Sequence, residues 1–273
     1  MCRLFGFRAS VPSALHRSLV RERNALREQA REHPDGWGLG WYVNGVPRVE
    51  RGLEPAREDE HFAELAQYVS ADAVVAHVRK ASVGAVSLVN THPFVEGPWI
   101  FAHNGTVPNY DRVRSAVEAT LPAPRRARLA GETDSERCFH AFLAHLEQAG
   151  HDPHDAALPL APVLEALAAM TNAMRALSET DGAAASLTFL VSNGRLMAAS
   201  RRGRSLYYAH EKAAGVAHPE ADQRRTPGLC HLLIASERIS DEDVWIEVPE
   251  GGAVGVDAEL RLTLGPLGTS HPG

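Results

Sequence analysis

The residue at position 2 is a cysteine, directly after the initiator Met1. Because cysteine is small, we expect aminopeptidase trimming to remove Met1 and leave a thiol and an α-amine together on Cys2. A thiolate is the nucleophilic form of cysteine, and an α-amine with an ordinary pKa of about 7.7–8.0 can accept its proton near neutral pH. Position 2 therefore predicts a nucleophile that carries its own base, unless the cysteine is an accident of a short tail.

Attack on an amide carbonyl also requires donors for the developing oxyanion. Residues 103–106, His-Asn-Gly-Thr, are predicted to form a turn at the end of a buried strand, so the Asn104 amide and the Gly105 N–H are candidate donors. Asn-Gly is ordinarily a hairpin signal, and the pairs at 44–45 and 193–194 are interpreted as plain hairpins. The residues after Gly105 do not resemble a returning strand, which favours the catalytic interpretation over a structural turn.

A substrate with an amino acid head group needs a cation for its carboxylate and an anion for its ammonium group. Arg79 ends an apolar predicted strand, where a guanidinium is costly to bury without a partner, and its fork geometry suits a carboxylate. Asp134 lies in a predicted capping box over residues 133–136. Each has a structural alternative, because Arg79 can reach solvent from a strand end and Asp134 can favour a helix N-terminus.

The remaining cysteines and the histidines predict no further chemistry. Cys138 and Cys230 lie in apolar patterns without a C-x-x-C pair, so we expect free thiols in the core. No H-x-x-x-H pair with an acidic companion occurs on a predicted helix, and neither a metal nor a cofactor is expected. A G-x-S-x-G elbow is missing, and the glycines at 36–40 lack the spacing and the lysine of a phosphate loop, so they are predicted to form a tight strand entry.

Hydrophobic periodicity predicts the elements that must position these residues. Helical spacing covers residues 13–31, 134–150 and 160–178. Strand patterns cover 38–43, 46–49, 73–79, 99–103, 186–191, 195–200, 206–209 and 232–235, with a further hairpin at 254–264. Since strands and helices do not alternate regularly, a doubly wound parallel sheet is disfavoured and an α+β fold with antiparallel sheets is expected.

The composition and charge of the chain exclude several classes of function. The 273 residues are 44% hydrophobic and 23% charged, with a formal net charge of −6, as in an ordinary globular protein. No block of like charges suggests a nucleic-acid partner, and no apolar run is long enough to span a membrane. The N-terminus lacks the apolar core and cleavage site of a signal peptide, so a cytoplasmic location is expected.

Several short motifs, taken together and in order, resemble the class II glutamine amidotransferases, which are N-terminal nucleophile hydrolases. The landmarks are MCRLFG at 1–6, HVRKAS at 77–82, NTHPF at 90–94, HNG at 103–105 and GETDSE at 131–136. Two more, DGWGLGWY at 35–42 and ASER at 235–238, are most similar to a stand-alone branch that includes hydrolases of γ-glutamyl compounds in ergothioneine and glutathione metabolism. The resemblance predicts one amidotransferase type-2 domain over residues 2–256, with Met1 removed, and a C-terminal strand and tail over 257–273.

The resemblance implies a role for each matching residue. Cys2 would attack a γ-glutamyl carbonyl and form a thioester, and Asn104 with the Gly105 N–H would form the oxyanion hole. Arg79 would hold the substrate α-carboxylate and Asp134 the α-ammonium group. The implied fold is a four-layer αββα sandwich of two antiparallel sheets.

One motif departs from the pattern of the family. In members fused to synthases, the strand-end arginine is commonly followed by Trp-Ala-Thr-His, whereas residues 80–83 here are Lys-Ala-Ser-Val. Ser82 still offers a hydroxyl to the carboxylate, but the histidine is missing. His92 is predicted either to orient the loop before Pro93 or to contact the substrate directly.

Three functions are compatible with these residues. The first is a stand-alone hydrolase of glutamine or another γ-glutamyl amide, with a small molecule as its only partner. The second is a glutaminase subunit that delivers ammonia to a separate synthase. The third is a catalytically silent binding or regulatory protein of the same fold, which retention of Met1 would indicate.

Overall fold

The computed structural model describes residues 2–14, 17–180, 182–212 and 228–267. Two β-sheets form its centre, and all strand pairings within them are antiparallel. None of the helices in these ranges has the length and the apolar character needed to cross a membrane.

The first sheet has seven strands in the order β11-β9-β10-β1-β4-β2-β3. They are β1 (Arg3–Ala14), β2 (Trp37–Val43), β3 (Val46–Gly52), β4 (Ser70–Val78), β9 (Tyr207–Ala209), β10 (His231–Ala235) and β11 (Ile246–Glu247). β1 is central, and its Phe5 lies opposite Ala76 of β4 and Ala235 of β10. The segment that follows Cys2 is therefore held between strands that are far away in the sequence.

The second sheet has six strands in the order β13-β12-β8-β7-β6-β5. They are β5 (Phe94–Glu96), β6 (Trp99–Thr106), β7 (Ser186–Ser192), β8 (Met197–Ser200), β12 (Gly252–Val256) and β13 (Leu262–Pro266). β6 pairs with β7 from Ile100 to Thr106.

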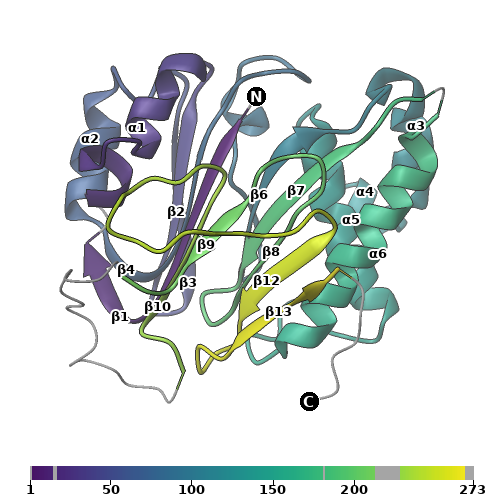
Figure 1. Cartoon of the computed structure of the whole chain (residues 1–273). Coiled ribbons are helices and arrows are strands. Elements are labelled where there is room, and N and C mark those ends of the chain that lie inside the picture. Colours follow the sequence, from purple (N-terminus) through teal and green to yellow (C-terminus); the bar gives the residue numbers. More distant parts are fainter. Residues whose placement is uncertain (1, 15–16, 181, 213–227, 268–273) are drawn as a thin grey trace.

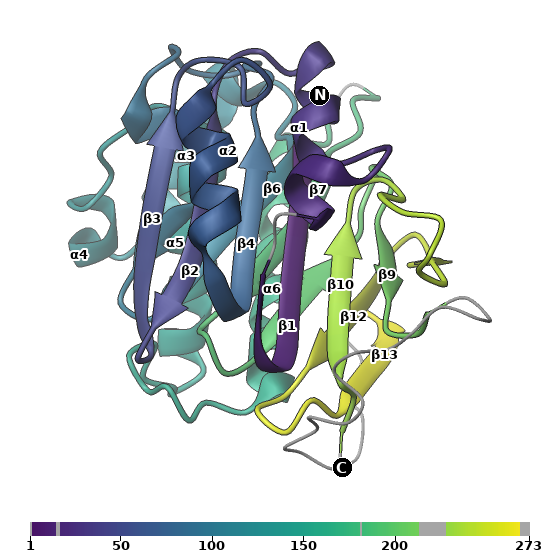
Figure 2. The ribbon, with the colours of Figure 1, turned by 90° about the vertical axis from the view of Figure 1, so that its left-hand side faces the viewer.

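Helices cover the outer face of each sheet. They are α1 (Leu26–Gln29), α2 (Glu60–Tyr68), α3 (Tyr110–Thr120), α4 (Ala123–Arg126), α5 (Asp134–Gln148) and α6 (Leu160–Ser178), with shorter helical segments at Arg17–Arg21, Ala30–Glu32 and Leu88–Asn90. Figure 1 shows α1 and α2 on one side of the paired sheets and α3 to α6 on the other, and Figure 2 views the first of these sides, with α1 and α2 in front of the first sheet.

The buried apolar residues form three layers that match this arrangement. One lies between α1, α2 and the first sheet and includes Phe5 and Phe62, and a second lies between the two sheets and includes Leu4 and Ile100. The third joins the second sheet to α5 and α6. The predicted α+β class and the four-layer αββα sandwich of two antiparallel sheets are thus confirmed.

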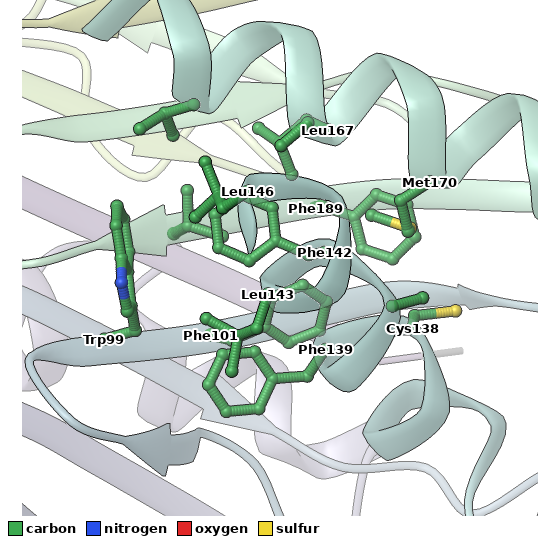
Figure 3. Close-up of a cluster of buried hydrophobic side chains, with 14 of the residues drawn as sticks. Trp99, Phe101, Cys138, Phe139, Phe142, Leu143, Leu146, Leu167, Met170 and Phe189 are labelled. Atoms are coloured by element: carbon green, nitrogen blue, oxygen red, sulfur yellow. The ribbon is translucent and has the colours of Figure 1, made fainter. Parts of the chain in front are cut away.

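Aromatic packing secures α5, whose N-terminus carries Asp134. Phe101 of β6 stacks on Phe139 of α5 with ring centroids 5.0 Å apart, and Trp99 meets Phe142 edge to face. Figure 3 shows these rings together with Leu167 and Met170 of α6. A fully buried side chain of this size stabilises the fold by roughly 1.5–3 kcal/mol. These contacts therefore hold α5, which begins with Asp134, against the second sheet.

The alternation of side chains along the strands places Asn104 on the side of its sheet that faces the other sheet, and Cys2 lies near the same layer. Leu4 and Ala102 belong to the layer between the sheets, whereas Phe5 and Phe101 face the helical layers. Since side chains alternate along a strand, Asn104 lies on the same side of β6 as Ala102. Cys2 precedes Leu4 by two residues and lies near the same end of the layer.

Most predicted elements are present, including the two Asn-Gly hairpins and the helices α5 and α6. The predicted strand entry at residues 36–40 is also confirmed, because β2 begins at Trp37. Gly38 is required there, since a Cβ at this position would lie 2.0 Å from the His92 carbonyl oxygen.

The single helix predicted over residues 13–31 is wrong. β1 continues to Ala14 and pairs with β4 again, with Ser13 opposite Ala71 after a shift in register. Only Arg17–Arg21, α1 and Ala30–Glu32 are helical, and residues 15–16 lie outside the described ranges. Pairing with β4 outweighs the helical periodicity, as tertiary contacts commonly do.

Candidate active site

The Cys2 thiol lies against the backbone of Lys80, two residues beyond the end of β4. Its sulfur is 3.4 Å from the Lys80 nitrogen, which donates to it, and 3.5 Å from the Lys80 carbonyl oxygen. The contact exists because β1 and β4 are paired, with Arg3 opposite Val78. A backbone N–H directed at the sulfur is suited to stabilise a thiolate.

Burial raises the pKa of the Cys2 thiol above its ordinary value, because the surrounding protein disfavours the thiolate. The Lys80 N–H and the positive charge of Arg79 act in the opposite direction, and the Asp134 carboxylate adds to the increase in pKa. The thiol is therefore largely protonated at neutral pH, and a base is needed to activate it.

A pocket of about 160 Å³ opens beside the thiol. Its walls are formed by Cys2, Lys80, Ala81, Ser82, Gly105 and Thr106. The Ser82 and Thr106 hydroxyls lie 3.3 Å apart and join the two walls across the sheets. Of the predicted site residues, Cys2, Ser82 and Gly105 are therefore brought together in one small cavity.

The predicted turn at residues 103–106 is wrong. These residues continue β6, with Asn104 opposite Thr188 and Gly105 opposite Leu187 in β7. Glycine is required at 105, because a Cβ there would lie 1.8 Å from the Ser186 carbonyl oxygen. Asn104 and Gly105 thus lie at the end of a buried strand, and Gly105 lines the pocket. Because they form a strand end and not a turn, no returning strand follows them.

The Asn104 side chain is 2% exposed and is held by a serine that the sequence analysis did not select. Its Nδ2 donates to Ser236 Oγ over 3.1 Å, and within the described residues its Oδ1 has no hydrogen-bond partner. An amide nitrogen carries two hydrogens, so one N–H remains for an oxyanion. The ASER motif contained Ser236, but no pattern in the sequence indicated its contact with Asn104.

Arg79 is buried next to the pocket and does not form its wall. Its guanidinium donates to the carbonyl oxygens of Val83, Gly84 and Ala85 over 3.1–3.2 Å. The charge of Arg79 nevertheless acts on the Cys2 thiol. A guanidinium carries five N–H groups, so this residue both shapes the loop and retains donors for a carboxylate.

Two further residues that the sequence analysis missed fix the same loop. Asn90 donates from Nδ2 to the Ala85 carbonyl oxygen and accepts the Glu132 N–H at its Oδ1, over 3.0 and 2.8 Å. The Glu132 carboxylate accepts the Ala85 N–H. The loop that follows Arg79 is therefore tied to the segment that leads into α5.

Asp134 begins α5, and Thr133 caps that helix by accepting the Glu136 N–H, as the motif predicted. The Asp134 carboxylate accepts the Val107 N–H over 2.7 Å and the Ser135 N–H over 2.8 Å. It is 4% exposed and acts electrostatically on Cys2, but it does not form the pocket wall. The helix cap is thus Thr133, and Asp134 lies in the first turn of α5, where a carboxylate favours the helix N-terminus.

Three buried histidines lie behind the pocket. His77 Nε2 contacts the His103 carbonyl oxygen over 3.2 Å, and the His77 and His92 rings pack in a tilted arrangement with centroids 4.2 Å apart. Burial lowers the pKa of His77 to about 3, so its ring is neutral. In the described part of the chain, no group of three or more His, Cys, Asp or Glu side chains is arranged to hold a metal ion. Cys138 and Cys230 are buried in the core, as predicted.

Two stacked antiparallel sheets between helical layers, with a cysteine thiol at the start of a central strand, have the architecture of an N-terminal nucleophile hydrolase. The chain belongs to the class II glutamine amidotransferases, whose family model matches residues 1–260.

Among curated relatives, the putative glutamine amidotransferase YafJ of Escherichia coli K12 is 26% identical over 267 residues, which cover 92% of this chain and 95% of that protein. The γ-glutamyl-hercynylcysteine sulfoxide hydrolase of Mycobacterium tuberculosis H37Rv is 29% identical over 217 residues, 79% of this chain and 72% of the relative. Matches to two other relatives span only part of their length: 39% of an uncharacterized protein of Methanocaldococcus jannaschii and 48% of the probable glutamine amidotransferase DUG3 of Saccharomyces cerevisiae.

Solved structures agree with the fold. A class-II domain protein of Silicibacter pomeroyi, titled a glutamine aminotransferase, superposes with a TM-score of 0.67 at 20% identity and covers 99% of this chain and 100% of that one. The glutamine phosphoribosylpyrophosphate amidotransferase of Bacillus subtilis has a TM-score of 0.64 at 15% identity, over 97% of this chain and 49% of that one.

Proposed function

We propose that this protein hydrolyses a γ-glutamyl amide bond, in glutamine or in a larger γ-glutamyl compound, through a thioester on Cys2. The observation that carries the proposal is the pocket in which the Cys2 thiol meets the Lys80 peptide, Gly105 and the hydroxyls of Ser82 and Thr106. The family supports amide chemistry, and the M. tuberculosis relative is named for hydrolysis of a γ-glutamyl compound.

The first half of the proposed reaction forms the acyl-enzyme. After removal of Met1, the α-amine of Cys2 takes the thiol proton, and the sulfur attacks the γ-carbonyl carbon. The carbonyl oxygen becomes an oxyanion and accepts hydrogen bonds from Asn104 Nδ2 and the Gly105 N–H. When the intermediate collapses, the C–N bond breaks, the leaving nitrogen receives the proton from the α-ammonium group, and a γ-glutamyl thioester remains.

The second half releases glutamate. The neutral α-amine takes a proton from water, whose oxygen attacks the thioester carbon, and the same two donors stabilise the second oxyanion. The C–S bond then breaks, and the proton returns to the sulfur. In this proposal, Arg79 and Ser82 bind the α-carboxylate of the substrate and Asp134 binds its ammonium group, which places the γ-carbon at the thiol.

A glutaminase subunit remains a second candidate because of one surface feature. Val86, Leu88 and Val89 are 47%, 50% and 52% exposed in the loop that Arg79 anchors. Exposed apolar side chains that gather beside an active site can mark a protein interface. If a synthase docks there, glutaminase activity rises when the partner is added.

The test is glutamate release from glutamine and from a panel of γ-glutamyl amines and peptides, with intact mass recorded to establish the loss of Met1. The wild-type enzyme and Cys138→Ala, which removes a thiol outside the site, are expected to release glutamate, and Cys2→Ala is not. The preferred member of the panel identifies the leaving group. Undiminished release by Cys2→Ala would exclude the mechanism, and a trimmed wild-type enzyme without activity would favour the partner-dependent subunit.

A further inference from the structure

We propose that Ser236 is a positioning residue that aligns the oxyanion amide of Asn104 with the strand that carries Cys2. This inference rests on the proposed function and deepens it. Ser236 directly follows β10, is 1% exposed and does not form the pocket wall, so it acts through other residues.

Ser236 connects three separate segments of the chain. Its Oγ accepts the Leu4 N–H over 3.0 Å and an Asn104 Nδ2 hydrogen over 3.1 Å, and its own N–H donates to the Leu4 carbonyl oxygen over 3.1 Å. Leu4 belongs to β1 in the first sheet, and Asn104 belongs to β6 in the second. A single hydroxyl oxygen therefore fixes the separation of the two sheets where the nucleophile and the oxyanion donor must converge.

The structure places Asn104 Nδ2, and not Oδ1, against Ser236 Oγ, which also accepts the Leu4 N–H. Rotation about the last side-chain torsion of asparagine is broad and roughly two-fold, so packing alone distinguishes poorly between the amide nitrogen and oxygen. With Nδ2 held by Ser236 Oγ, its second N–H remains for the proposed oxyanion beside Gly105, although Asn104 itself does not form the pocket wall. Without this acceptor, the amide is free to turn and present Oδ1, whose partial negative charge would repel an oxyanion.

The contact with Leu4 acts on the nucleophile. Cys2 is two residues from Leu4, a distance of about 6.6 Å along an extended chain. The paired hydrogen bonds between Ser236 and Leu4 extend the β1–β10 ladder beyond Phe5 and Ala235, toward the N-terminus. Loss of the hydroxyl removes the acceptor for the Leu4 N–H but keeps the backbone bond, so β1 is expected to remain in register.

The experiment is a double-mutant cycle on glutamate release, with Ser236→Ala, Asn104→Ala and the double variant, each normalised to the fraction of reactive Cys2 thiol. Asn104→Ala is expected to lower kcat about 10²–10³-fold, as for other oxyanion donors. Ser236→Ala is expected to lower kcat about 10–100-fold with KM changed less than about threefold, because amide orientation matters most in the transition state. In the Asn104→Ala background, Ser236→Ala is expected to lower kcat by less than about threefold.

Two control variants distinguish a positioning role of Ser236 from a general loss of protein stability. Ser205→Ala removes a half-buried hydroxyl that donates to the Ser236 carbonyl oxygen over 2.9 Å, and the kcat of this variant is expected to stay within about threefold of wild type. Ser236→Thr restores the hydroxyl and is expected to recover most of the kcat lost in Ser236→Ala. A wild-type kcat in Ser236→Ala, or equal losses in both backgrounds, would overturn the inference. If Cys2→Ala were as active as wild type, the proposed function itself would fail.

Discussion

At the scale of single residues, the Cys2 thiol needs a base, and in the proposed mechanism its own α-amine supplies it. Burial raises its pKa, so the thiolate is scarce at neutral pH despite the Lys80 N–H and the charge of Arg79. His77, a buried histidine two residues before Arg79, contacts the His103 carbonyl oxygen. An α-amine exposed by removal of Met1 is then the simplest base within reach of the sulfur.

This account predicts the pH dependence of the reaction. The α-amine accepts a proton only when it is neutral, so kcat/KM is expected to rise about tenfold per pH unit below the amine pKa of about 7.7–8.0 and to level off above it. The measurement is a pH–rate profile for the trimmed enzyme. A form that retains an uncleaved N-terminal tag keeps the thiol but lacks the free amine on Cys2, and it should be inactive across the range. A tagged form with the wild-type profile would contradict the base assignment.

At the scale of elements, the loop after β4 is held by the guanidinium that is proposed to bind the substrate. Arg79 holds the carbonyl oxygens of Val83, Gly84 and Ala85, and Asn90 and Glu132 fix the other side of the loop. An incoming carboxylate would compete for the same guanidinium. Substrate binding and loop order are therefore expected to be coupled.

The variant Arg79→Lys tests this coupling. An ammonium group keeps the charge but cannot bond three carbonyl oxygens and a carboxylate in the fork geometry of a guanidinium. We expect the KM for glutamine to rise at least about tenfold and amide hydrogen exchange over residues 83–90 to accelerate, whereas exchange in α5 stays unchanged. Faster exchange in α5 as well would indicate general destabilisation, and unaltered loop exchange would show that Arg79 does not order the loop.

Local signals predicted local elements well. The Asn-Gly turns, the Thr133 cap and the apolar face of α5 depend on residues a few positions apart, and the structure has all of them. Residues 13–14 belong to β1, whose strand character depends on pairing with β4, more than fifty residues away, so the helical periodicity that begins at residue 13 was misleading there. Asn104 was assigned to a turn for the same reason, since its partner strand β7 follows much later.

The contacts among site residues were beyond prediction from spacing. Cys2, Gly105 and Ser82 share a pocket, but the Lys80 peptide that touches the thiol and the Ser236 hydroxyl that holds Asn104 are products of sheet assembly. The resemblance to the family indicated segments of which Cys2, Ser82 and Gly105 line one pocket. It did not indicate that Arg79 and Asp134 also bind the backbone of their own surroundings.

At the scale of the whole molecule, the layer between the sheets includes buried neutral histidines that link stability to pH. Burial lowers the pKa of His77 to about 3 in the folded state, whereas an unfolded histidine has a pKa of about 6.5. Between these values, the unfolded chain binds the proton and the folded chain does not. The stability is therefore complete above pH 6.5 and is lost as the pH falls toward 3.

For His77 alone, we expect the free energy of unfolding to fall by about 2 kcal/mol between pH 7.5 and pH 5. The variant His77→Gln cannot bind this proton, so its loss over the same interval should be smaller by about that amount in urea titrations. His61→Gln, at a position whose side chain is 57% exposed, should match the wild-type loss. Equal losses in wild type and His77→Gln would show that His77 does not contribute.

The most direct test of the central claim is mass spectrometry of the trimmed enzyme, quenched with acid during turnover of a γ-glutamyl amide and digested. The account predicts a peptide that begins at Cys2 and carries one γ-glutamyl group, which disappears on treatment with hydroxylamine and is enriched in Asn104→Ala if deacylation becomes limiting. Steady turnover with no adduct on Cys2, or with the adduct on another residue, would contradict it.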